Sequence, residues 1–210
     1  YAALLSHRSG IVENLGFLGS YRLIGIRAER DMMADRLAYV AAVLTEAPAA
    51  DPGTFLYSNA GYVVVGAMLE ARTGQPWEEL VATHVFGPLG MTEVGFGPAP
   101  AVLGHKRGVL GGLAAVPPGP AADNVPALGP AGTVHLPMAD MLRFLAAHAA
   151  EDPAFLTPES WSRLHTPVAP DEPYAMGWRL ADDGSLRHNY FTPGAEAFLV
   201  MRQSRAKQLG

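Results

Sequence analysis

The sequence contains no cysteine, very few lysines and no long hydrophobic run. Without cysteine the chain can form no disulfide, thiol nucleophile or cysteine-ligated metal site, and its redox compartment stays open. Lys106 and Lys207 are the only lysines, and a net charge of −5 without a basic run argues against nucleic acid as a partner. The longest strongly apolar run, residues 62–69, is far shorter than the roughly 20 residues of a membrane span. We therefore expect no membrane span in this chain.

The remaining composition is that of an ordinary globular protein. The chain has 210 residues, of which 49% are hydrophobic, and can bury one sizeable core, in one lobe or two. The first residues lack the basic-then-apolar pattern of a signal peptide. Because the chain opens at Tyr1 rather than at a methionine, we expect that leading sequence is missing.

The most informative stretch is DPGTFLYSNAGY at residues 51–62, which continues into the apolar run. Pro52 and Gly53 mark a turn, and either Ser58 or Asn59 is a suitable N-cap for the helix that follows. The helix is expected to end at Gly74. This arrangement places a tyrosine and an asparagine at a helix entrance, where polar groups can face a cleft.

Elsewhere the pattern predicts several helices before residue 150. A helix is expected from Asp31 to Pro48, a short one from Pro76 to Gly87, and another over residues 137–148. Residues 95–132 are rich in proline and glycine, which is typical of a long loop that borders a site.

The last part of the chain predicts antiparallel β-structure. Thr157 and Pro158 begin a short helix, and strand-like runs follow at residues 174–180 and 188–201. The tripeptide DDG at residues 182–184 is a good hairpin turn after the first run. The fold class is therefore α/β (α+β), a single domain over residues 1–210. It has a mostly helical lobe at 1–150, and a short helix with antiparallel strands at 151–210.

The order of these signals resembles the serine β-lactamase and penicillin-binding-protein superfamily, in its class C, DD-peptidase and esterase branch. LLSHRSG at residues 4–10 is similar to the family's LL-[ST]-H-x-SG helix end, and YSN at 57–59 to its Y-x-N motif. HNY at 188–190 lies where the family has K-T-G or H-x-G. Three further segments also match, namely VFGPLGMT at 85–92, DNVPALGPAGT at 123–133 and DMLRF at 140–144.

The resemblance implies a β-lactamase/transpeptidase-like fold with an antiparallel sheet flanked by helices, and a chain that lacks N-terminal and C-terminal pieces. The family's nucleophile is the serine of an S-x-x-K motif upstream of LLSHRSG, so we expect it to lie outside this chain. The only S-x-x-K match here, from Ser204 to Lys207, is in a polar C-terminal segment with no apolar helix after it. We interpret it as a chance match.

The resemblance also assigns roles to residues. Tyr57 would move the proton between the serine and the leaving group, and with a reference pKa of about 10 it needs cationic neighbours to act as a base. Asn59 would orient the lysine or the substrate amide, or simply cap the helix. His188 would be a donor on the strand that lines the cleft, and the backbone N–H of Phe191 a candidate oxyanion donor. Asn189, Tyr190 and Phe191 would contact substrate.

Tyr190 departs from the family pattern, which has glycine at that position so that a ligand can lie against the strand. Because alternate strand residues share a face, Tyr190 would narrow the cleft beside His188. The implied function is a serine hydrolase that forms an acyl-enzyme on a β-lactam, a D-amino-acid peptide or a small ester. The alternatives are a non-catalytic binding member of the fold and an inactive fragment.

Other kinds of site find little support. The histidines other than His188 show no H-x-x-x-H pairing, so neither a metal nor another cofactor is expected. The methionine pairs at 32–33 and at 138 and 141 are at apolar helical positions and are expected in the core. The expected partner is a small-molecule or peptide substrate, and the oligomeric state is left open. The family's usual export implies a periplasmic or extracellular location.

Overall fold

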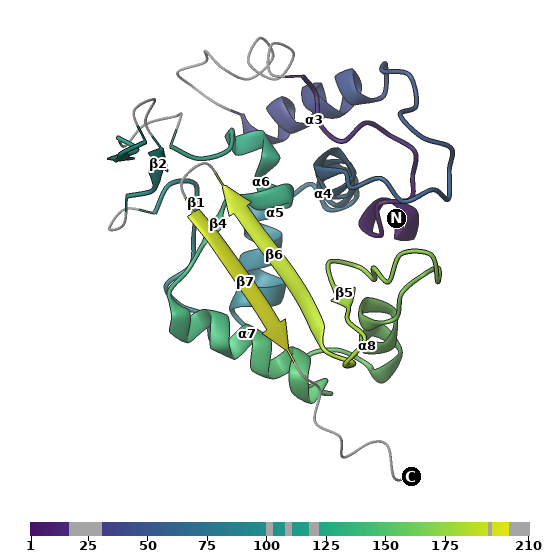
Figure 1. Cartoon of the computed structure of the whole chain (residues 1–210), viewed down its shortest axis with the longest axis vertical. Helices are drawn as coiled ribbons and strands as arrows, with labels where there is room; N and C mark the ends of the chain where they lie inside the picture. Colours follow the sequence, from purple (N-terminus) through teal and green to yellow (C-terminus); the bar gives the residue numbers. More distant parts are fainter. Residues whose placement is uncertain (17–30, 100–102, 108–110, 118–121, 193–194, 202–210) are drawn as a thin grey trace.

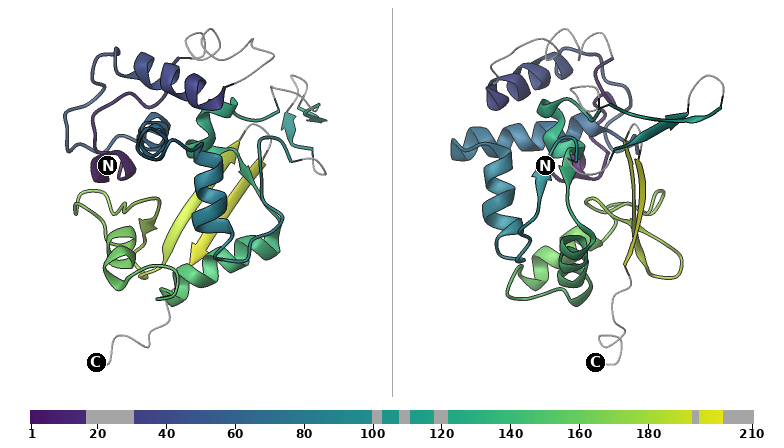
Figure 2. Two further views of the ribbon diagram at one scale, coloured as in Figure 1. Left: turned by 180° about the vertical axis from the view of Figure 1, so that it is seen from behind. Right: turned by 90° about the vertical axis from the view of Figure 1, so that its left-hand side faces the viewer.

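The computed structural model describes residues 1–16, 31–99, 103–107, 111–117, 122–192 and 195–201, with only the backbone for 106–107 and from 190 onward. Helices occupy one side of a β-hairpin formed by β6 (Leu186–Thr192) and β7 (Ala195–Met201), as Figures 1 and 2 show. The mixed α/β architecture expected from the sequence is therefore confirmed.

The described residues before β1 form helices. These are α1 (Ala2–Leu5), α3 (Met32–Val43), α4 (Asn59–Thr73), α5 (Trp77–Val81) and the π-helix η1 (Ala82–Phe86). Asp31 caps α3 by accepting hydrogen bonds from the amides of Met33 and Ala34, both at 3.1 Å. Gly74, with φ 72°, ends α4 in the left-handed conformation that favours glycine. The predicted start of α3 and end of α4 are thus confirmed, although α3 stops well before Pro48.

The proline- and glycine-rich region contains short elements as well as loop. These are β1 (Gly95–Phe96), β2 (His105–Arg107), β3 (Leu113–Ala115), the 3-10 helix η2 (Pro126–Leu128) and α6 (Gly129–Gly132). β2 and β3 form an antiparallel pair that projects from the body of the molecule (Figure 2). β1 instead pairs with β4 (Val134–His135).

The C-terminal part adds α7 (Met138–Ala150), α8 (Pro158–His165) and a sheet of order β5-β6-β7, in which β5 is Arg179–Leu180. Thr157 caps α8 through the amide of Ser160 at 3.3 Å, as predicted. The predicted turn at 182–184 connects β5 to β6. The run predicted at 188–201 is two antiparallel strands rather than one, and Pro193 and Gly194 between them lie outside the described residues.

Among the described residues, two groups of buried side chains form the core. One lies between α3, α4 and η2 and includes Tyr39, Val43 and Val63. The other lies between α7 and the sheet and contains Trp178 and Leu186, with Phe144 and Leu145 against them. The division into lobes at residue 150 stays a prediction.

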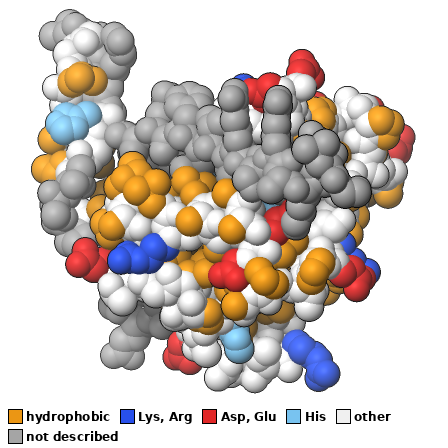
Figure 3. Space-filling view, turned by 90° about the horizontal axis from the view of Figure 1, so that it is seen from below, with side chains coloured by type: hydrophobic (Ala, Val, Ile, Leu, Met, Phe, Trp, Pro, Cys, Tyr) orange, Lys and Arg blue, Asp and Glu red, His pale blue; other side chains and the backbone are white. Residues whose placement is uncertain are grey.

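The core prediction for the methionines was wrong at one position. Met138 is 72% exposed and Leu142 is 58% exposed, so this face of α7 lies on the surface. In the space-filling view from below, hydrophobic side chains appear there among charged ones (Figure 3). Apolar periodicity identified the helix correctly, but it could not tell which apolar positions another element covers.

Candidate active site

Tyr57 lies in the residues that lead into α4, and the two residues after it have different structural roles. The Ser58 hydroxyl accepts from the amide of Gly61 at 3.0 Å and donates to the carbonyl of Val12 at 2.7 Å. Ser58 is therefore the N-cap, and its hydroxyl is fully engaged. Asn59 is the first residue of α4, and its Nδ2 donates to Oδ1 of Asn14 at 3.1 Å. The capping role considered for Asn59 is thus excluded.

The Tyr57 side chain is partly open to solvent. It is 42% exposed, while its ring lies against the imidazole of His7, with 4.0 Å between the ring centroids. Burial of the remainder raises the pKa of Tyr57. The phenol is therefore protonated at neutral pH and can donate a hydrogen bond. Acting as a base would require a cationic neighbour that lowers its pKa.

His7 is the centre of an aromatic cluster that the sequence did not single out. Its ring centroid lies 5.3 Å from that of Tyr62 and 4.8 Å from that of Tyr174, with Phe55 at 5.9 Å. The Tyr62 hydroxyl donates to the carbonyl of Leu5 at 2.8 Å. Burial raises the pKa of both Tyr62 and Tyr174, so these phenols are also neutral. The one available sequence signal was the LLSHRSG motif itself, which contains His7.

His188, on β6, is linked to the edge of this cluster through Gly177. Its Nδ1 lies 2.7 Å from the carbonyl oxygen of Gly177, so Nδ1 carries the hydrogen and donates it. Gly177 in turn lies close to Tyr62, because a Cβ placed on it would be 3.7 Å from the Tyr62 hydroxyl. Burial lowers the pKa of His188. Burial is also the main cause that lowers the pKa of His7, and a positive charge on His188 would add to that effect. In the neutral ring Nε2 is an acceptor, so a donor role at Nε2 would require protonation of His188.

The other predicted substrate contacts follow His188 along β6. Asn189 is exposed and pairs with Phe198 of β7, while Tyr190 pairs with Ala197 and Phe191 with Glu196. The side chains of Tyr190 and Phe191 lie outside the described part of the structure. Narrowing of the cleft by Tyr190 and the oxyanion role of the Phe191 amide both stay predictions.

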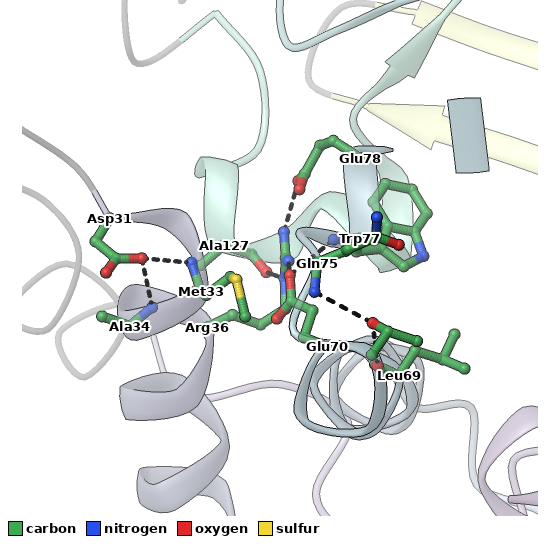
Figure 4. A network of polar contacts seen from close by, with 11 residues as sticks. Asp31, Met33, Ala34, Arg36, Leu69, Glu70, Gln75, Trp77, Glu78 and Ala127 are labelled. Carbon is green, nitrogen blue, oxygen red and sulfur yellow. Dashed lines mark hydrogen bonds and ion pairs between the residues drawn. The ribbon is translucent and has the colours of Figure 1, made fainter. Parts of the chain in front are cut away.

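The remaining motif segments hold the framework together. Asp140 is buried in α7, and its Oδ2 accepts from the amide of Glu93 at 2.9 Å, so the residue that directly follows VFGPLGMT is held against DMLRF. Arg36 is fully buried between Glu70 and Glu78, and its Nε donates to the carbonyl of Ala127 at 3.2 Å (Figure 4). This network fixes the loop of DNVPALGPAGT against α4 and α5.

The described residues contain neither a cluster suited to a metal nor a serine-lysine pair of S-x-x-K type. No three histidine, aspartate or glutamate side chains come together there in a way that could hold an ion. Ser204 and Lys207 lie outside the described residues. Among the described helices, none is long and apolar enough to cross a bilayer.

Comparison with known proteins places this mixed α/β fold in the serine β-lactamase and penicillin-binding-protein superfamily. The profile of the family described as Beta-lactamase matches residues 2–206, so the chain belongs to that family. Over 149 residues it is 30% identical to the putative penicillin-binding protein PbpX of Bacillus subtilis (strain 168). That match covers 68% of this chain but 36% of PbpX, so the chain spans little more than a third of that relative.

Solved structures show the same fold. A penicillin-binding protein from Bacillus halodurans superposes with a TM-score of 0.72 at 21% identity, over 94% of this chain and 62% of that one. A D-stereospecific amidohydrolase from Streptomyces sp. superposes with a TM-score of 0.69 at 20% identity, over 96% of this chain and 64% of the other.

Proposed function

We propose that this chain contributes two walls of the active site of a serine hydrolase that forms an acyl-enzyme on an amide or an ester. The observation that carries the proposal is that Tyr57 lies in the aromatic cluster around His7, and that His188 is hydrogen-bonded to a residue beside the same cluster. Tyr57 contacts His7 directly, and His188 is bonded to Gly177 beside Tyr62. Residues of two motifs that are far apart in the sequence therefore lie near the same group of aromatic side chains, which supports the proposal.

Each wall has a defined chemical task in such a reaction. A serine hydroxyl is a weak nucleophile until a base takes its proton, and the departing group needs a proton in return. The partly exposed Tyr57 hydroxyl would carry that proton between the two groups, and would donate it to the leaving group. Asn59 would orient the lysine or the substrate amide. His188 and Asn189 would line the strand wall, where the Phe191 amide would stabilise the oxyanion.

The substrate classes that fit are a β-lactam, a D-amino-acid peptide and a small ester. Similarity to a D-stereospecific amidohydrolase supports an amide among them. Tyr190 stands where the family has glycine, which favours a small substrate over one that extends along the strand.

The test uses the full-length product of the gene that encodes this chain, with a fluorophosphonate or a labelled penicillin as probe. We expect a covalent adduct detected by intact mass, and an acylation rate about 10²- to 10⁴-fold lower in Tyr57→Phe. Tyr1→Phe is the matched control, because Tyr1 is 64% exposed and remote in sequence from the Y-x-N motif. Equal rates in Tyr57→Phe and in the wild type would remove Tyr57 from the mechanism.

The second candidate function is a non-catalytic binding member of the fold, and Tyr190 at the glycine position is the observation that favours it. A full-length protein that binds a labelled penicillin reversibly, but yields no adduct with either probe, would establish this alternative. An adduct that maps to an S-x-x-K serine would dismiss it.

A further inference from the structure

His7 has a backbone conformation that its residue type adopts infrequently. It follows α1 with φ 59°, one of two described non-glycine residues with positive φ. Such conformations persist where surrounding contacts hold them, and they concentrate at functional sites. Several of the contacts that hold His7 lead to the segment that carries Tyr57.

His7 binds the residues on both sides of Tyr57. Its carbonyl oxygen accepts from the amide of Leu56 at 2.8 Å, and its Nδ1 accepts from the amide of Ser58 at 2.9 Å. One residue therefore fixes the backbone before and after Tyr57, by its main chain on one side and its side chain on the other.

The residues after His7 also accept hydrogen bonds from the segment that leads to Tyr57. The carbonyl of Arg8 accepts from the amide of Gly53 at 2.9 Å, and that of Gly10 from the amide of Ala49 at 2.9 Å. The stretch of residues 7–10 therefore hydrogen-bonds to the backbone of the segment that precedes Tyr57. Among these residues, His7 also contacts the Tyr57 ring.

The charge state of His7 follows from these contacts. Because Nδ1 accepts a hydrogen bond from an amide, the hydrogen of the neutral ring is on Nε2. Burial lowers the pKa of His7 to about 4, so the ring is uncharged at neutral pH. The titratable groups that face it are Tyr57, Tyr62, Tyr174 and His188, all of which are neutral under the same conditions. Nε2 is buried without a hydrogen-bond partner among the described residues.

We propose that His7 is a positioning residue, which holds the Tyr57 ring and the turn into α4 in place through a neutral imidazole protonated on Nε2. The imidazole makes no contact with the reacting atoms in this role. It limits the Tyr57 hydroxyl to one region of the cleft by packing against the ring and by fixing the amide of Ser58. The importance of this positioning for catalysis rests on the function proposed above for Tyr57.

Two substitutions separate the contributions of the ring and the acceptor. In His7→Asn the side-chain oxygen can stand where Nδ1 stands, and asparagine tolerates positive φ, but the ring is lost. In His7→Gln the amide reaches the position of Nε2, so neither the Nδ1 acceptor nor the ring is kept. His84→Asn, at an exposed histidine on η1, is the matched control.

Nuclear magnetic resonance on the chain itself provides a readout that does not depend on activity. In the wild type we expect the ¹⁵N signals of His7 to show a protonated Nε2 and an unprotonated Nδ1. The hydrogen-bonded shift of the Ser58 amide should persist in His7→Asn and be lost in His7→Gln. The Tyr57 ring signals should move in both variants and stay unchanged in His84→Asn.

Two results would overturn the proposal, namely a hydrogen on Nδ1 of His7 in the wild type, or Tyr57 signals that do not move in His7→Asn. Neither result needs His7→Gln to fold.

Acylation of the full-length protein separates this inference from the proposed function. We expect His7→Gln to acylate about 10²-fold more slowly at saturating probe, because a displaced catalytic group loses roughly that factor, with His7→Asn closer to the wild type. If Tyr57→Phe leaves acylation unchanged while the spectra behave as described, the proposed function fails and the positioning by His7 stands. If Tyr57→Phe is slow and the His7 variants are not, the positioning proposal fails alone.

Discussion

At the scale of the residue, Arg36 shows how a buried charge is accommodated. Its side chain is fully buried, and it pairs with Glu70, which is 3% exposed, and with Glu78 at 2.6 Å. Glu70 also accepts from the amide of Trp77 at 2.9 Å. Burial and the nearby Glu78 carboxylate raise the pKa of Glu70, while the Trp77 amide and the arginine act in the opposite direction. Each charge is therefore tolerated only because its partners are present.

Replacing Arg36 by methionine should destabilise the chain strongly. The substitution keeps much of the apolar volume but leaves two carboxylates facing each other without a cation. We expect the free energy of unfolding in urea to fall by about 3–5 kcal/mol. The double variant Arg36→Met with Glu70→Met should recover part of this loss, because it also removes the buried carboxylate.

The control for this prediction is an exposed ion pair. Arg163 and Glu159 are 3.3 Å apart on α8, with side-chain exposures of 61% and 78%. Glu159→Gln should change the free energy of unfolding by no more than about 0.5 kcal/mol. A cost for Arg36→Met as small as that of Glu159→Gln would show that the buried network is not needed for stability.

At the scale of the element, α4 contacts several other segments at close range. Its Ser58 cap is bonded to Val12, and Gly61 allows the carbonyl of Leu4 to approach, since a Cβ there would lie 3.0 Å from that oxygen. Gly66 likewise allows α6 to approach α4 closely, because a Cβ on Gly66 would overlap the ring of Pro130. Small residues on α4 therefore set the distances to its neighbours.

Gly66→Ala should destabilise the chain although alanine is the better helix former. The added methyl group would meet a rigid proline ring, with Pro130 Cβ at 3.0 Å, so α4 and α6 must separate. We expect a loss of about 1–3 kcal/mol in urea denaturation. Ala71→Gly, at an exposed position of the same helix, measures the propensity difference alone, about 1 kcal/mol. A gain in stability for Gly66→Ala would mean that the two helices are not in close contact.

At the scale of the whole molecule, buried histidines connect stability to pH. Burial lowers the pKa of His7 to about 4 and that of His148 to about 3. The ring of His148 packs among Phe144, Trp161 and Trp178. Its Nδ1 lies 3.0 Å from Nε2 of His165. The other ring nitrogen of His165, Nδ1, lies 3.8 Å from a carboxylate oxygen of Glu151. Unfolded histidines titrate near 6.5, so below that pH the unfolded chain binds protons that the folded chain does not.

Stability should therefore fall as the pH is lowered from 6.5 to about 4. The shift at His7 alone corresponds to about 3 kcal/mol, which is fully lost once the pH passes below the folded pKa of about 4. Urea denaturation between pH 7.5 and pH 4 measures the effect. His148→Phe should make the dependence shallower, since it keeps an aromatic ring and removes a titrating group. His84→Gln should leave the profile as in the wild type. A flat profile in the wild type would contradict burial of these rings.

Much of the fold could be predicted from residue patterns. The cap at Asp31, the end at Gly74, the cap at Thr157 and the turn at 182–184 are local features, because each depends on the preferences of a few neighbouring residues. The split of the last run into β6 and β7 was missed, although proline and glycine stand between the two strands in the sequence. Strand length depends on which residues pair, and pairing is not local.

The sequence by itself determined the class of protein and the two motifs of the candidate site, since Tyr57 and His188 stand in runs whose order already resembled the family. Only the tertiary structure decided what surrounds them. It placed His7 against Tyr57 and Gly177 against His188, made Ser58 rather than Asn59 the cap, and left Met138 on the surface. The physical reason is that a motif records which groups are required locally. The burial of an imidazole and its protonated nitrogen depend on contacts between segments far apart in the chain.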